Sequence, residues 1–367
     1  SLAPRRFRPA LAVFGVALAL TLILLGTWHL GAPEPPSQPA RSIAVLSFAI
    51  DSEPNSTYIA DGLAEEIRVA LAAIPETLVI GKQSSDYFEK WNASGQEIGD
   101  SLRVAYVLEG KVSLKADELK IWSRLVETGT GTEIWHQNFH GTWQQFYEFQ
   151  RELLRLTNQT LGGEVVEGEP VADAANAGTD QEVYLLYHQA RALIHERTKP
   201  SLLEAQKKLE EVLRLNPAYA QAHLGMAKTY LELARFANYY GEDWHGESRA
   251  LAKPHIDRAL EIDAGLAEAY ILQGSLVSYY DWELEEQSYR QAVALNPNLA
   301  EAHMELGIHL CNQVYSSLAC LYHLEKAYEI EPLSVDTAGI LALFLHYVPE
   351  RRHEIAPIFS TLRTRYP

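Results

Sequence analysis

The sequence has little cysteine: Cys311 and Cys320 are the only two among 367 residues. Two cysteines exclude a disulfide framework and a paired CxxC metal site. Two interpretations remain open. They form a single bridge if the chain folds in an oxidising compartment, or they are two half-buried helix residues. A bridge requires Cα atoms within about 7 Å of each other.

Clustered basic residues are also lacking beyond Arg41. Residues 42–367 hold 27 Lys and Arg against 47 Asp and Glu, a net charge of −20. A surface that binds a nucleic-acid duplex needs grouped Lys and Arg to displace counterions. We therefore expect no nucleic-acid partner for this part of the chain.

Catalytic motifs are missing too, because the sequence contains no nucleophile elbow, P-loop or Rossmann fingerprint. Asp61, Glu65 and Glu66 form a carboxylate cluster, but both glutamates fall away from the apolar positions of their helix, which predicts a solvated face. His136 and His140 lie on a predicted strand without a third ligand in sequence reach. We expect no catalytic, cofactor-binding or metal-binding residue here. The chain itself is therefore not expected to be an enzyme.

The longest apolar run, residues 10–30, has no charged residue. Its length matches the roughly 20 residues that a helix needs to cross a bilayer. Basic residues precede the run at Arg5, Arg6 and Arg8, and the next one is Arg41. The positive-inside rule then predicts a single-pass helix in the inner (cell) membrane, with a cytoplasmic N-terminus and exported, periplasmic or extracytoplasmic, later domains. A cleaved signal peptide and a buried core helix are the competing interpretations.

The predicted helix divides the chain. Residues 1–9 form a cytoplasmic stub, and residues 31–41 form a spacer with four prolines. The chain begins with Ser1 rather than Met. We therefore expect a cytoplasmic domain to precede it.

Residues 42–162 alternate between strand and helix patterns. Short β-branched runs at 42–50 and 78–80 predict strands, the first buried on both faces. Apolar residues recur with helical spacing after the first strand, at Ile59, Leu63, Ile67, Leu71 and Ile74. A short helix at 95–102, three strands at 105–114, 119–127 and 133–139, and a closing helix at 143–162 complete the pattern. The order predicts a compact α/β domain with a mixed sheet.

Four blocks in this domain carry a resemblance: SIAVLSF, YIADGLAEEI, LVIGKQSS and VAYVLEGKVSLKADELKIWSRLVETGTGTEIW. Residues 42–162 resemble the TolB amino-terminal-like domain, a FlgO-related family. Val126-Glu127 departs from that family, which usually has an acidic residue followed by a small one. No functional site depends on this departure.

A linker of low apolar content at 163–180 precedes a different pattern. From residue 181 to 367, helix pairs recur around the landmarks Asn216-Pro217, Asp263-Ala264, Asn296-Pro297 and Glu331-Pro332. Two of the three spacings lie close to the 34-residue tetratricopeptide period, and the first contains an insertion. Small residues at Ala259, Ala292 and Ala327, with Val212 in the first unit, are expected to let helices approach closely. The expected fold class is therefore α/β plus all-α: one transmembrane helix, a small mixed α/β domain and an α-solenoid.

The first helices of such repeats present a concave face. By position, the residues expected to line a protein- or peptide-binding groove are Leu185, Gln189, Leu224, Lys228, Ile271, Ser275, Met304 and Ile308. Residues 334–347 and 351–365 predict a further helix pair, after which we expect the repeats to continue.

Three segments of the repeats carry a second resemblance: SYYDWELEEQSYRQAVALNP, AEAHMELG and EKAYEIEPLSV. They resemble the repeats that follow TolB-like domains in bacterial single-pass membrane regulators. In such proteins a CadC-type winged-helix domain, or an adenylate cyclase domain, precedes the membrane helix. The resemblance implies a signalling or transcription-regulating protein whose exported domains sense or bind a partner, and whose effector domain is absent here. A membrane-anchored scaffold or assembly protein with no effector domain is the alternative. A homodimer is compatible with either.

Overall fold

The computed structural model describes residues 39–50, 54–90, 93–115, 118–163, 180–240, 245–277, 281–313 and 318–365. The predicted stub and membrane helix lie outside these residues, as do most of the spacer and linker. Within the described ranges, no helix combines the length and the apolar character that crossing a bilayer requires.

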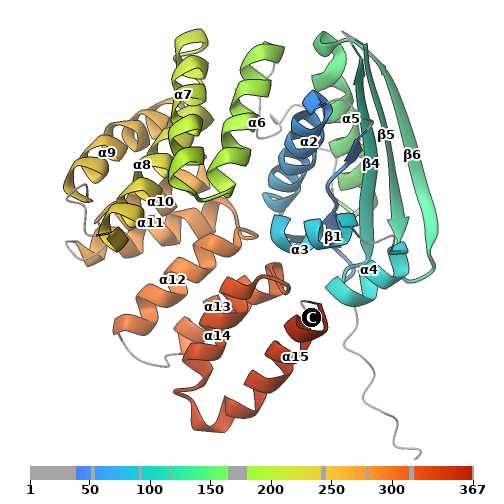
Figure 1. Cartoon of the computed structure of the whole chain (residues 1–367). Coiled ribbons are helices and arrows are strands. Elements are labelled where there is room, and N and C mark those ends of the chain that lie inside the picture. The colour runs from blue at the N-terminus through green and yellow to red at the C-terminus, as the bar shows by residue number, and fades with distance from the viewer. Residues whose placement is uncertain are drawn as a thin grey trace, which may run out of the picture. The chain divides into compact units, whose positions relative to one another are not determined.

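A mixed sheet forms the first part of the described chain (Figure 1). Its strand order is β3 (Leu78–Ile80), β1 (Ser42–Val45), β4 (Tyr106–Lys115), β5 (Glu118–Glu127) and β6 (Thr132–Gly141). Strands β3, β1 and β4 are parallel, and β4, β5 and β6 form an antiparallel meander. The predicted mixed sheet is confirmed. The strand expected at 42–50 is divided into β1 and β2 (Ala49–Ile50), which both pair with β4.

Helices cover the two faces of this sheet. The helices α2 (Pro54–Ala72) and α5 (Trp143–Thr160) share a core with Ile43 and Val45 of β1. Ala44 faces the other way, into a second cluster with residues of η1 (Tyr87–Lys90) and α4 (Gly95–Leu102). Strand β1 is therefore buried on both faces, as predicted. The sequence analysis missed η1 and the short helix before it, α3 (Lys82–Asp86). We call residues 39–163 the sheet unit.

The helical array, residues 180–365, follows as antiparallel pairs (Figure 1). Its helices are α6 (Gln181–His195), α7 (Lys199–Leu215), α8 (Ala220–Tyr240), α9 (His245–Ile262), α10 (Ala267–Val277), α11 (Trp282–Leu295), α12 (Ala300–Gln313), α13 (Leu318–Ile330), α14 (Val335–Leu345) and α15 (Ile355–Arg365). A 3₁₀ segment, η2 (Pro349–Glu354), precedes α15. The array has the pair-by-pair packing of tetratricopeptide repeats.

The landmark residues make the same turn in successive repeats. The side chains of Asn216, Asp263 and Asn296 each accept a hydrogen bond from the backbone N–H two residues later, at 2.8–3.1 Å. Such Asx turns reverse the chain between one pair and the next. His223, Tyr270 and His303, each seven residues after a landmark, contact the backbone carbonyl that follows the same landmark.

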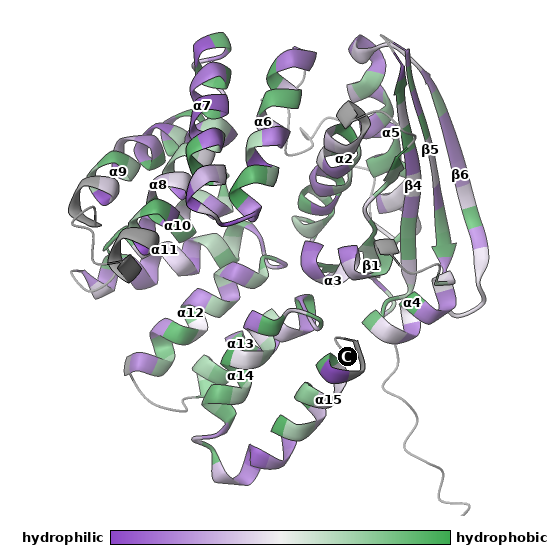
Figure 2. Ribbon diagram, viewed as in Figure 1, coloured by the Kyte–Doolittle hydropathy of each residue, from purple (hydrophilic) through white to green (hydrophobic). Residues whose placement is uncertain are grey.

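Small residues allow the paired helices to approach closely, as the sequence predicts. A Cβ added at Gly274 would lie 2.5 Å from the ring of Tyr289, and one at Gly307 would lie 2.7 Å from Leu324. The small landmark-preceding residues Ala259, Ala292 and Ala327 are buried. Figure 2 shows that α14 is coloured mainly as hydrophobic, and its residues Ala338, Leu341 and Phe344 belong to the core cluster of the array's last helices.

Candidate functional site: the contact between the sheet unit and the helical array

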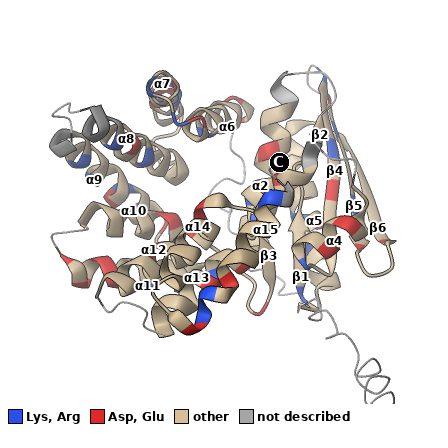
Figure 3. Ribbon diagram, turned by 60° about the horizontal axis from the view of Figure 1, so that its bottom comes forward, with Lys and Arg blue, Asp and Glu red and all other residues tan. Residues whose placement is uncertain are grey.

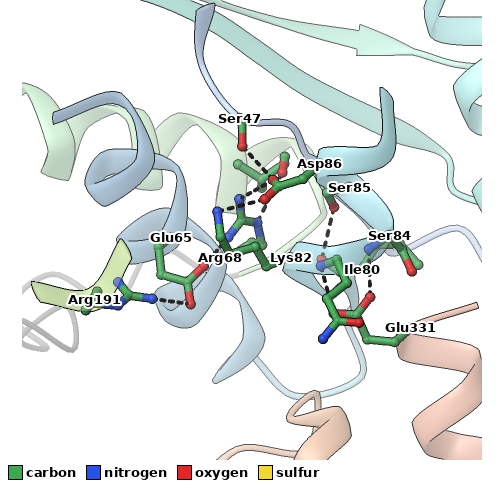
Figure 4. A network of polar contacts seen from close by, with 12 residues as sticks. Ser47, Glu65, Arg68, Ile80, Lys82, Ser84, Ser85, Asp86, Arg191 and Glu331 are labelled. Carbon is green, nitrogen blue, oxygen red and sulfur yellow. Dashed lines mark hydrogen bonds and ion pairs between the residues drawn. The ribbon is translucent and has the colours of Figure 1, made fainter. Parts of the chain in front are cut away.

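A network of charged side chains joins three segments of the sheet unit (Figure 4). The buried guanidinium of Arg68 on α2 pairs with Glu65, donates to the carbonyl of Val45 at 3.1 Å and lies 3.7 Å from Asp86. Asp86 also pairs with Lys82 at 2.7 Å. Because these groups come from α2, α3 and the end of β1, the network fixes the outer face of α2 against its neighbours.

The helical array adds its own charges to this network. Arg191 of α6 pairs with Glu65 at 3.1 Å (Figure 4). Glu66, next along α2, accepts a hydrogen bond from Gln150 at 2.8 Å and lies 3.7 Å from His188 of α6. The prediction that Glu65 and Glu66 form a solvated helix face is therefore wrong. Their side chains are only 22% and 9% exposed, because α6 covers them.

The surroundings of the ionisable side chains at this contact shift their pKa values and so determine which of them are charged at neutral pH. Burial acts to raise the pKa of Glu65, but the positive charges of Arg68 and Arg191 outweigh it and lower that pKa to about 2. Burial, together with Arg191, holds the pKa of His188 well below its ordinary range. At neutral pH the contact therefore contains charged pairs and a neutral imidazole at His188.

Aromatic packing reinforces the contact at α6. Tyr184 is fully buried, and its ring lies 4.9 Å from that of Trp143 and 5.7 Å from that of Phe146, both on α5. Gly62 of α2 faces the Tyr184 hydroxyl so closely that any Cβ there would clash with it. The first helix of the array thus completes the hydrophobic core of the sheet unit.

The other end of the array contacts the edge strand β3. Asn298 accepts a hydrogen bond from the Val79 N–H at 3.2 Å and donates to the carbonyls of Ala72 at 3.0 Å and Thr77 at 2.7 Å. One residue past β3, the Gly81 N–H donates to the carbonyl of Ile330 at 3.0 Å. The array therefore occupies the edge of β3 where another strand would otherwise pair.

Glu331 extends this second contact to α3. Its carboxylate accepts hydrogen bonds from the backbone N–H groups of Gln83 at 3.1 Å and Ser84 at 2.8 Å (Figure 4). Burial raises the pKa of Glu331, and the hydrogen bonds from Ser84 and Gln83 oppose that rise. Leu333, two residues later, is fully buried in the cluster around Ile80.

The sequence distinguishes Glu331 and Asn298 from the equivalent residues of the other repeats. Glu331 occupies the landmark position where the three other turns have Asn or Asp, and Asn298 replaces the small residues Ala218 and Gly265 two positions after a landmark. Longer side chains at turn positions that are otherwise short indicate contacts outside the repeat itself.

The predicted groove residues do not share one environment. Leu185 packs against the core of the sheet unit, and Ile271 is only 2% exposed within the array. Ile271 is therefore not available to an incoming peptide, and Leu185 is partly covered by the sheet unit. Lys228 lies 3.8 Å from Glu301, and Gln189 accepts a hydrogen bond from Lys208 at 2.8 Å. The remaining four, Leu224, Ser275, Met304 and Ile308, are partly buried. A groove that includes them stays a prediction.

The two cysteines form a disulfide between α12 and α13, with their Cα atoms 5.2 Å apart. This is the first of the two interpretations that the sequence left open.

Across the described ranges, no group of three or more His, Cys, Asp or Glu side chains is placed to hold a metal ion. Figure 3 shows acidic and basic residues interspersed along the helices rather than gathered by sign.

Comparison with known proteins gives a limited result. No family model matches the chain. A protein of Rhizobium meliloti (strain 1021) named "Putative adenylate cyclase 3" is 29% identical over 220 residues, which are 59% of this chain and 36% of that protein. The chain thus matches about a third of the length of this relative.

Among solved structures, the thermophilic TPR protein TTC0263 of Thermus thermophilus aligns with a TM-score of 0.39 and 17% identity, covering 55% of this chain and 94% of that one. MamA aligns with a TM-score of 0.34 and 21% identity, covering 47% and 92%. TM-scores this low do not establish a common fold, so the assignment of helix pairs comes from the chain's own contacts.

Proposed function

We propose that this chain is the sensing part of a membrane-anchored signalling protein. In this proposal the helical array binds a protein or peptide partner, residues 10–30 anchor the chain in the membrane, and a cytoplasmic effector domain precedes Ser1. The observation that carries the proposal is the 220-residue similarity to part of a longer protein named as a cyclase. The effector is accordingly proposed to be an adenylate cyclase domain, with a DNA-binding domain as the competing choice.

The disulfide supports export of the array. Disulfides persist in oxidising spaces outside the cytoplasm and are rare within it. A bridge between Cys311 and Cys320 agrees with a periplasmic or extracytoplasmic position for everything after the membrane helix. The basic residues before the apolar run favour the same orientation.

The contact with the sheet unit supports transmission of a signal. The array is attached at α6 through Arg191 and at the α13 end through Glu331. A partner that shifts one helix pair of the array therefore acts on α2 and β3, which lie in the same sheet unit that follows the spacer. In a loosely tethered array, partner binding would have no such mechanical consequence.

In the first experiment the gene is sequenced upstream of the codon for Ser1. The whole protein that it encodes is then expressed in membranes. We expect a cyclase domain, and we expect formation of cyclic AMP from ATP to change when Arg191→Met weakens the attachment of α6 to the sheet unit. A reading frame that starts just before Ser1 would contradict the proposal and leave the anchored scaffold. An upstream DNA-binding domain would redirect the output to transcription.

A fusion of alkaline phosphatase after residue 163 tests independently whether the sheet unit is exported.

A further inference from the structure

Strand β6 (Thr132–Gly141) is the second edge of the sheet. Its inner neighbour is β5, and among the described residues no strand pairs with its other side. In Figure 1 it runs along the outside of the sheet, away from the helical array. An edge of this kind presents a row of backbone N–H and C=O groups that a further strand can pair with.

Most of β6 lacks the usual protections against such pairing. Proteins blunt exposed edges with charged residues, especially lysine, with proline, with β-bulges, with short length or with a covering element. The segment TEIWHQNFHG is ten residues long and contains neither lysine nor proline. Its one irregularity lies near its start, where the register with β5 shifts between Leu125 and Val126. From Trp135 to Gly141 the pairing with β5 is regular.

We propose that β6 pairs antiparallel with β6 of a second copy of this chain, so that two sheets join into one across a two-fold axis. The occupant has to be an extended strand, because only a strand matches a row of alternating donors and acceptors. The chain itself supplies one of the right length, since β6 is the long strand with a free edge among the described residues. A two-fold axis makes such an interface self-complementary.

The side chains favour a register centred on Gln137. Directly opposed residues share a face of the sheet, so Trp135 would oppose the partner's Phe139 on the face that α5 covers. Phe139 already stacks on Phe149 of α5, with ring centroids 5.0 Å apart. The pairing would therefore extend an existing aromatic layer. Aromatic cross-strand pairs contribute roughly 0.2–1 kcal/mol each relative to alanine pairs.

Charge complementarity supports the same register. Glu133 contacts His136 at 2.8 Å and lies 4.0 Å from Arg124, which places it on the outer face of the sheet. His140 contacts Glu118 on that outer face. The irregular pairing between residues 133 and 135 brings Glu133 near the partner's His140. The interface would then place a carboxylate beside an imidazole at each end.

The test places cysteine on the proposed axis. The variant Gln137→Cys is made in the full chain and kept in detergent, because residues 10–30 are apolar. A residue on the axis faces its own copy with Cα atoms about 4.5–5.5 Å apart, which is within disulfide range. We expect most of the Gln137→Cys protein to form a covalent dimer on mild oxidation, at least about tenfold faster than Asn138→Cys or the exposed α11 variant Gln287→Cys.

A second measurement needs no cysteine. Hydrogen exchange of the β6 amides in the unchanged chain should slow as protein concentration rises, and Asn138→Lys should abolish that dependence. Protection that does not depend on concentration would mean that β6 is covered within one chain, and would overturn the proposal. Equal cross-linking at all three cysteine positions would also overturn it. Neither result bears on the cyclase assay, so the two proposals fail separately.

Discussion

The two edge strands of the sheet, β3 and β6, differ in what contacts their outer sides. Strand β3 is three residues long and is closed by side chains and backbone of the helical array, including Asn298 and Ile330. Strand β6 is ten residues long, and no strand of the described chain pairs with its outer side. One edge is therefore part of the internal architecture, whereas the other has no pairing strand among the described residues.

The difference shows that an edge does not need another strand to be satisfied. Asn298 offers one acceptor and two donors, as a strand backbone does, and a single amide side chain thereby replaces a short stretch of ladder. That solution suits a three-residue edge. It does not extend to ten residues, which would need a covering segment or a second strand. The comparison can be tested by substitutions that remove the hydrogen bonds between the helical array and β3. It can also be tested by adding a lysine to β6, which should disfavour pairing with a further strand.

The largest effect is expected from Asn298→Ala. The change removes three hydrogen bonds and leaves the buried Val79 N–H without its partner, so we expect a loss of about 2–3 kcal/mol in the free energy of unfolding of the sheet unit. Urea unfolding measures it. Asn298→Asp should be at least as damaging, because a carboxylate oxygen would replace the NH2 group and face the carbonyl oxygens of Ala72 and Thr77. The matched variant Asn138→Ala on β6 should change stability by less than about 0.5 kcal/mol. Equal losses at the two edges would contradict the comparison.

Glu331→Ala is expected to rank second, at about 1–2 kcal/mol, because it removes two hydrogen bonds to the start of α3. Glu331→Gln should cost less, since burial already disfavours the charged carboxylate and an amide oxygen still accepts a bond. Hydrogen exchange at Gln83 and Ser84 reports the change locally. If the glutamine variant proved the more damaging one, the charge rather than the hydrogen bond would be what holds the array.

Local sequence patterns predicted the elements better than the contacts between them. The periods that define α2, α4, α5 and the meander depend on neighbours along the chain, and these elements lie close to the predicted positions. The pattern of α2 also led to the wrong environment for Glu65 and Glu66. The sequence of α2 alone does not predict that α6, more than a hundred residues later, covers its polar face. The missed helix α3 is five residues long, too short for a helical period to appear.

The environments of two predicted groove residues were missed for the same reason, whereas the groove itself stays a prediction. Leu185 lies on the first helix of a repeat and would face a groove in an isolated array, but here the sheet unit occupies that position. Ile271 is enclosed by the packing of its neighbours. Position within a repeat predicts which side of the helix a residue occupies. It does not predict what else in the chain covers that side.

Arg191→Met tests the attachment at α6 and should cost about 1 kcal/mol at neutral pH, because Glu65 keeps Arg68 as a partner. The pKa of Glu65 is about 2 in the folded chain and 4.5 ordinarily, so the unfolded chain binds more protons between these values. The contribution of Glu65 is therefore present above pH 4.5 and lost as the pH falls towards 2. In the variant the folded pKa rises, and this part of the acid-induced loss should shrink. An unchanged pH profile would show that Arg191 does not act through Glu65.

The smallest effect on a single chain, and the sharpest contrast between the edges, is expected from Asn138→Lys. The residue is exposed on β6, so a lysine there should change the free energy of unfolding by no more than about 0.5 kcal/mol. It should nevertheless weaken pairing with a second copy, because each lysine would lie one position from the axis, opposite the partner's His136, and lysine disfavours pairing at a strand edge. Light scattering of the detergent-solubilised chain measures the oligomer, and Gln287→Lys on α11 serves as the control. A variant as dimeric as the unchanged chain would mean that β6 is not where two copies meet.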